Sequence, residues 1–191
     1  VKVDNLHEGK TFNLHVGKIG LRYIMVVSTI MFCLFIVTYG DRMVYDDWVR
    51  MPEPFLLWIN TLILIFSSLV FIRIQLASKK NNFEKVKREL VLIGVLAVGF
   101  LIGQLLVWQN MIEAGYYISG SPANGYFYVF TTLHGFHLLG GLIYWMMTIN
   151  KVWKLESIVI RKAKHTVELC AIYWHFLLAV WAVLFALMLF T

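Results

Sequence analysis

The sequence predicts an all-α protein of the polytopic membrane class, a bundle of five transmembrane helices. Hydrophobic residues make up 60% of the 191 residues and charged residues only 15%. A soluble domain is closer to about half apolar and a quarter charged. The few charges are also clustered, which leaves long charge-free stretches between them. These stretches are continuously apolar without alternation, which favours membrane helices over the strands of a membrane barrel.

The charge-free stretches define the spans, because a helix needs about 20 mostly apolar residues to cross a bilayer. The predicted spans are residues 22–40, 55–76, 90–110, 126–149 and 169–190. The fourth span starts late because residues 115–125 carry the Gly, Ser, Pro and Asn typical of a loop.

We interpret residues 1–191 as a single membrane domain that begins with a polar cytoplasmic segment, residues 1–18. No signal peptide is expected, because the first apolar run is long enough to span and lacks a cleavage-site pattern. Cys33 and Cys170 fall in or beside apolar runs and form no CxxC pair, so we expect buried thiols.

The distribution of lysine and arginine predicts the orientation of the chain in the membrane. All of the 17 basic residues except Arg42 and Arg50 fall on one alternating side of the spans. The positive-inside rule makes that side cytoplasmic, with the C-terminus periplasmic. The net charge of +6 does not indicate a nucleic-acid partner, because the basic residues lie between apolar runs and not on one amphipathic face.

Polar residues inside the spans mark faces that pack against protein. His134 and His137 share a helix face, and Glu168 and His175 belong to a small-or-polar stripe. We expect these four residues to form an interhelical polar core. A b-haem between His137 and His175 is an alternative, because the two residues lie at similar depths. Two neighbouring histidines facing a single one fit hydrogen bonding better than haem ligation.

Small and basic residues suggest two further roles. We expect four glycines to let helices approach closely, namely Gly99, Gly103, Gly140 and Gly141. Arg22 and Arg73, at span ends, are candidates for lipid headgroup contact or for snorkelling to the interface. No carboxylate lies at the predicted membrane centre and the three prolines lie outside the spans, which argues against a transporter or an independent pump.

Four motifs together resemble one family. They are Gly20-Leu21-Arg22-Tyr23, Asn60-Thr61 with Ser67-Ser68, the HGxHxxGG run from His134 to Gly141, and the ExxxxYWHFxxxVW run from Glu168 to Trp181. The last two, in this order and separation, are highly specific. From about Val16 onward the chain resembles subunit III of the haem–copper respiratory oxidases, in the short five-helix bacterial form.

The resemblance implies a non-redox subunit in the bacterial inner membrane, with no catalytic residue, haem or metal of its own. Haem and copper are expected in the main partner, subunit I, beside subunit II and other oxidase subunits. The complex would reduce oxygen to water and pump protons. The family also binds phospholipid and sustains proton uptake. Membership of a respiratory supercomplex is left open.

Two positions depart from the family pattern. Phe32 stands where the family usually carries a buried glutamate, and Leu178 stands where the closing motif commonly has an aspartate. We therefore expect this chain to support the structure of subunit I and not to take a direct part in proton handling. The alternatives are the related membrane subunit associated with nitric oxide reductases and, from another class, a b-haem electron-transfer protein.

Overall fold

A computed structural model describes residues 8–52, 54–153 and 160–190, and every regular element in them is a helix. The five helices are α1 (Glu8–Arg42), α2 (Phe55–Lys79), α3 (Phe83–Glu113), α4 (Pro122–Trp153) and α5 (Ile160–Phe190). The prediction of an all-α fold with five helices is confirmed. Each helix is longer than its predicted span, because charged residues at the ends continue the helix beyond the apolar stretch.

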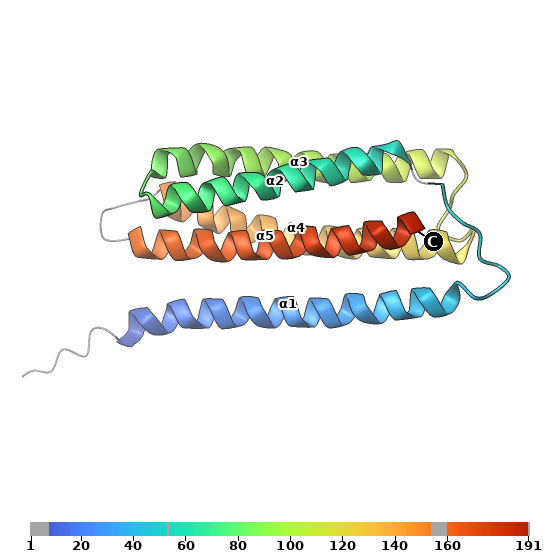
Figure 1. Cartoon of the computed structure of the whole chain (residues 1–191), viewed down its shortest axis with the longest axis horizontal. Helices are drawn as coiled ribbons and strands as arrows, with labels where there is room; N and C mark the ends of the chain where they lie inside the picture. The colour runs from blue at the N-terminus through green and yellow to red at the C-terminus, as the bar shows by residue number, and fades with distance from the viewer. Residues whose placement is uncertain (1–7, 53, 154–159, 191) are drawn as a thin grey trace, which may run out of the picture.

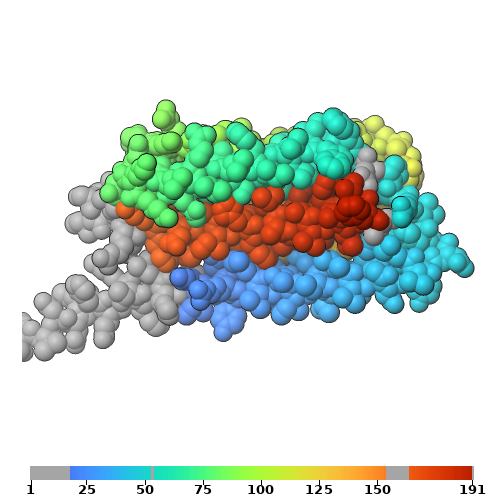
Figure 2. All heavy atoms as spheres, in the orientation of Figure 1, coloured from blue at the N-terminus to red at the C-terminus, as the bar shows by residue number. Residues whose placement is uncertain are grey.

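The helices run side by side, and successive helices point in opposite directions (Figure 1). α2 packs against α3 and α5, and α4 packs against the same two helices. α1 lies outside this four-helix bundle and packs against α5 (Figure 2). The start of α1 and the end of α5 are therefore at opposite ends of the molecule (Figure 1).

Within the part of the chain that the structure describes, four segments are long and apolar enough to cross a membrane. They are Lys18–Arg42, Phe55–Lys79, Phe83–Glu113 and Lys164–Phe190. The 32-residue α4 is not among them. Its buried face carries polar side chains, including Asn124, Thr131, His134 and Thr148. These lower the hydropathy of α4, yet they face protein and not lipid.

The turn between α2 and α3 is tight and capped. Asn81 adopts a positive φ of 58°, which asparagine tolerates better than most residues. The side chain of Asn82 accepts a hydrogen bond from the backbone N–H of Lys85 (3.1 Å), which satisfies one free donor at the start of α3. This turn brings the basic end of α2 beside the basic start of α3.

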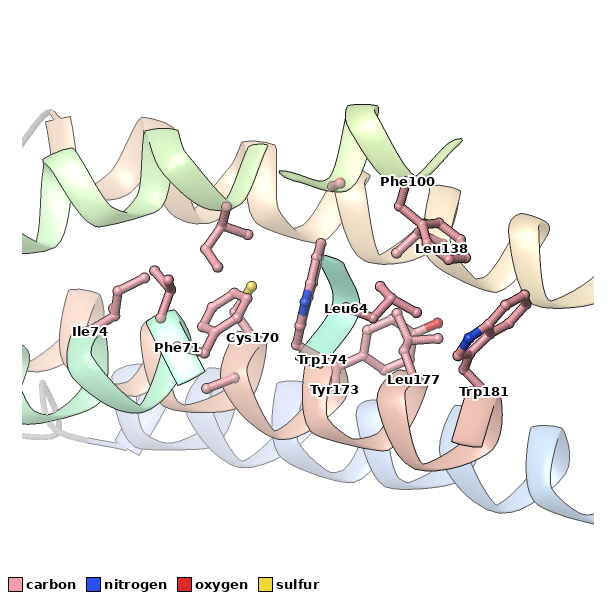
Figure 3. Close-up of a cluster of buried hydrophobic side chains, with 14 of the residues drawn as sticks. Leu64, Phe71, Ile74, Phe100, Leu138, Cys170, Tyr173, Trp174, Leu177 and Trp181 are labelled. Carbon is pink, nitrogen blue, oxygen red and sulfur yellow. The ribbon is translucent and has the colours of Figure 1, made fainter. Parts of the chain in front are cut away.

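The interior of the α2–α5 bundle is built from large aromatic and aliphatic side chains (Figure 3). Trp174 and Trp181 of α5 are fully buried. Trp181 packs edge-on against Phe100 of α3 at 5.1 Å between ring centroids, and Trp174 lies 5.2 Å from Phe71 of α2. One helix, α5, thus supplies the largest side chains at the centre of the bundle.

A second, smaller cluster attaches α1 to the bundle. Phe32 and Tyr39 of α1 are buried with Phe130 of α4 and Leu184 of α5. The opposite face of α1 is exposed and apolar, and Cys33 lies exposed on this helix. The expectation of two buried thiols is therefore wrong for Cys33 and right for Cys170, because α1 has protein on one side only.

A substitution at Gly94 of α3 tests how closely α3 and α4 approach each other. A Cβ added there would clash with the indole ring of Trp145, whose Nε1 donates to the carbonyl of Leu90 at 2.9 Å. We expect Gly94→Ala to destabilise the folded chain by about 1–3 kcal/mol, because the ring must move and weaken that bond. Unfolding in mixed detergent micelles measures the change.

Gly99→Ala is the matched control on the same helix. No atom lies within 4 Å of a Cβ added at Gly99. An equal loss for both variants would contradict the proposed close contact at Gly94.

Candidate functional site

Tryptophan N–H groups join the helices by donating to hydroxyl groups. Trp174 Nε1 donates to Ser67 Oγ at 2.8 Å, and Trp181 Nε1 donates to Thr61 Oγ1 at 3.0 Å, so two bonds join α5 to α2. A third such bond, between Trp108 and the hydroxyl of Thr131 (3.0 Å), joins α3 to α4. These bonds were not predicted from the sequence. The available signal was the presence of hydroxyl residues inside apolar spans.

The bonds of Trp174 to Ser67 and of Trp181 to Thr61 form a seam between α2 and α5. His175 adds a third contact to this seam. Its Nδ1 lies 2.6 Å from Ser68 Oγ, so the consecutive residues Trp174 and His175 are bonded to the consecutive residues Ser67 and Ser68. The imidazole of His175 therefore faces α2.

His137 links α4 to α5 through its backbone and not through its ring. Its carbonyl accepts a hydrogen bond from Tyr173 Oη at 3.0 Å. Its Nδ1 is 2.7 Å from the carbonyl of Leu133 on the same helix, and its ring packs 5.3 Å from Phe32 of α1. The imidazole thus faces α1.

His134 is fully buried between two aromatic rings. Its ring centroid lies 5.0 Å from that of Trp181 and 6.0 Å from that of Phe100. Neither ring nitrogen has a hydrogen-bond partner among the described residues. His134 is therefore an aromatic packing residue in this structure and not a hydrogen-bonding one.

The three imidazoles do not form a common ligand site. His134 faces α3 and α5, His137 faces α1 and His175 faces α2. A bis-histidine haem needs two imidazoles on either side of one planar space, and these contacts do not provide it. In the described ranges, no group of three or more His, Cys, Asp or Glu residues could hold a metal ion.

Glu168 does not join the histidines. It is exposed and lines a hollow of about 320 Å³ at the basic end of the bundle, together with Gln75, Ser78, Lys79, Lys164 and Val167. His175 is seven positions further along α5, about 10 Å along the helix. The placement of Glu168 in the polar core is corrected, because an end-of-helix carboxylate remains hydrated at lower cost.

The four predicted glycines differ in their surroundings. A Cβ at Gly141 would lie 3.1 Å from the ring of Tyr173, and one at Gly103 would clash with Asn60. A Cβ at Gly140 would make only an ordinary contact (3.7 Å to Tyr173 Oη), and Gly99 borders open space. Close helix approach therefore occurs at Gly103 and Gly141 but not at Gly99, and at Gly94, which the sequence analysis missed.

Arg73 has a partner that the sequence analysis did not assign. Its Nη2 lies 2.8 Å from Oε1 of Glu89, which is 8% exposed on α3. Glu89 falls just before the predicted third span and is buried because α2 covers it. Arg22 is exposed on α1.

The two departures from the family pattern lie in apolar surroundings. Phe32 is 4% exposed and packs against the ring of His137. Leu178 is partly buried against the main core. Because phenylalanine and leucine carry no ionisable group, neither side chain can take up or release a proton.

The fold and these contacts define an integral membrane helical bundle whose interior polar groups bind other helices. A sequence model of the cytochrome c oxidase subunit III family matches residues 48–191. The chain therefore belongs to the cytochrome c oxidase subunit III family.

Named relatives agree with the family assignment. The chain is 29% identical over 194 residues to a cytochrome c oxidase subunit 3 of Thermostichus vulcanus, covering 98% of this chain and 92% of the relative. It is 28% identical to the Synechocystis sp. protein of the same name, covering 86% and 71%. For the Bacillus subtilis protein of that name the identity is 26%, covering 84% and 77%.

A double-mutant cycle on Ser68 and His175 measures the seam between α2 and α5. We expect Ser68→Ala and His175→Leu to be less than additive, with a coupling of about 0.6 kcal/mol, typical of hydrogen bonds inside membranes. Pairing His137→Leu with Ser68→Ala is the control and should be additive. Strict additivity in both cycles would show that the bond contributes nothing to stability.

The Phe32→Glu variant tests whether the surroundings of residue 32, beside His137, are apolar. We expect this variant to lower the melting temperature, because a carboxyl group enters an apolar contact. Nε2 of His137 offers a hydrogen-bonding position, so adding His137→Leu should destabilise Phe32→Glu by a further 1–3 kcal/mol, roughly the cost of an unpartnered buried polar group. Leu34→Glu, on the exposed face of α1, should show no such dependence on His137.

Proposed function

We propose that this chain is the non-redox subunit III of a bacterial haem–copper terminal oxidase, which reduces oxygen to water and pumps protons. The observation that carries the proposal is the match to the cytochrome c oxidase subunit III family over residues 48–191. The three relatives reported above are all named as oxidase subunits, which favours the oxidase over the nitric oxide reductase alternative.

The contacts inside the bundle support a structural role. His137, His175, Trp174 and Trp181 all make bonds to other residues of the chain. A bundle of this kind presents a rigid surface to subunit I, where the haem and copper are bound. Subunit II and other oxidase subunits would complete the assembly.

The charge distribution supports an orientation. Basic residues gather where α2 ends and α3 begins, among them Lys79, Lys80, Lys85 and Arg88. The opposite end carries Asp41, Asp46, Asp47 and Glu113. The guanidinium of Arg42 donates to Asp47 and holds the pKa of that carboxyl below its usual value. The basic end would face the cytoplasm and the acidic end the periplasm.

We also propose that α4 crosses the inner membrane with the other four helices. It packs between α3 and α5 along the bundle, and its 32 residues correspond to about 48 Å of helix. Bound phospholipid is part of the proposal. An apolar groove of about 220 Å³ between α1 and α5, lined in part by Thr29, Cys33 and Phe176, has the chemistry that an acyl chain requires.

Purification of the tagged chain in mild detergent tests the proposal. We expect a haem–copper subunit I to co-purify, whereas the isolated chain should be colourless. An unrelated membrane protein with the same tag controls for nonspecific capture. Recovery of the folded chain without any haem–copper subunit, or with a nitric oxide reductase, would overturn the proposed function.

A further inference from the structure

A hollow of about 410 Å³ lies at the turn between α2 and α3. Its lining includes three cationic side chains, Arg73, Lys80 and Lys85, beside Leu76, Ala77 and Asn82. The hollow is at the end of two helices that are apolar enough to cross a bilayer. Its depth therefore corresponds to the headgroup region of a membrane.

Within the described ranges, the positive charge of the hollow is neutralised only in part, by the ion pair of Arg73 with Glu89. Among the described residues, neither Lys80 nor Lys85 lies within ion-pair distance of a carboxylate. The nearby exposed carboxylate of Glu84 is bonded to Lys87 instead, at 2.9 Å. Two ammonium groups are therefore available to an anion.

Arg73 is held in place and still has donors to offer. Its Nη2 is bonded to the buried carboxylate of Glu89 at 2.8 Å, while its side chain remains 55% exposed. A guanidinium carries five N–H donors, so this bond leaves others free for a phosphate. Glu89 thus orients the side chain of Arg73 and leaves N–H donors of its guanidinium available.

An apolar stripe leads from the hollow along the outer face of α2. Its residues follow helical spacing and are all exposed: Leu62, Ile65, Leu69, Ile72 and Leu76. The stripe covers about 21 Å of helix, the length of an extended acyl chain. A soluble phosphate would need only the cations, whereas a phospholipid would use both the cations and the stripe.

We propose that this hollow is a headgroup site for an anionic phospholipid, with its phosphate held by Arg73, Lys80 and Lys85 and an acyl chain lying on the stripe of α2. This site is separate from the groove between α1 and α5. It rests on the proposed function only in requiring a bilayer around α2 and α3. Because zwitterionic lipids bring a cation with their phosphate, the site should prefer anionic lipids.

The test uses the full chain with its co-purified subunits, stripped of lipid and returned to vesicles that contain phosphatidylglycerol and phosphatidylcholine. Native mass spectrometry of the re-extracted protein then measures which lipid is retained. We expect phosphatidylglycerol to be enriched. Lys80→Gln and Lys85→Gln should each weaken its retention about fivefold.

Lys79→Gln and Arg88→Gln are matched controls, because these residues lie at the same end of the bundle but do not line the hollow. Equal losses in the controls, or equal retention of both lipids, would overturn the site. Displacement of phosphatidylglycerol by excess inorganic phosphate would also overturn it and indicate a free-anion site. Co-purification of subunit I in the same preparation shows whether the proposed function fails separately.

Discussion

The bilayer core offers no water to an indole N–H or a hydroxyl group, so each such group must find its partner inside the protein. The seam between α2 and α5 meets this requirement. α2 provides Thr61, Ser67 and Ser68, and α5 provides Trp181, Trp174 and His175 as their partners. The largest buried side chains of the bundle are thus oriented by hydrogen bonds as well as by packing. The positions of α3 and α4 follow, since α3 packs against α2, α4 packs against α5, and α3 and α4 pack against each other.

The polar face of α4 follows from the same constraint. Thr131 accepts from Trp108, and Asn124 donates to the carbonyl of Tyr117, so hydrophilic side chains on this helix serve the interior. His134 is different, since aromatic rings surround it and its nitrogens have no described partner. A helix can thus have modest hydropathy and still belong in a membrane, provided that its polar side faces its neighbours.

The periphery of the molecule is formed by exposed apolar and charged side chains. α1 packs on the outside of the bundle, mainly through an aromatic cluster with α4 and α5, and its outer face is apolar. At the basic end, Glu89 holds Arg73 at the junction of α2 and α3. An uncompensated buried carboxylate would be costly there, so the ion pair stabilises the turn while the remaining cations face the interface. The polar groups inside the bundle therefore join helices to one another, whereas most cations at its basic end remain at the surface.

The sequence by itself determined the number of helices, their apolar character and the family, because charge-free runs and the two closing motifs are local properties of the chain. It also identified residues that do lie at helix contacts, such as Gly103, Gly141 and His175. Only the tertiary structure decided which side chains meet. Glu168 and Gly99 have suitable residue types and spacing, yet they lie at exposed or open positions. Glu89 and Gly94, in contrast, acquire their roles from Arg73 on α2 and Trp145 on α4. Helical periodicity assigns a residue to a face of its own helix, but the neighbour that covers this face depends on how the helices pack.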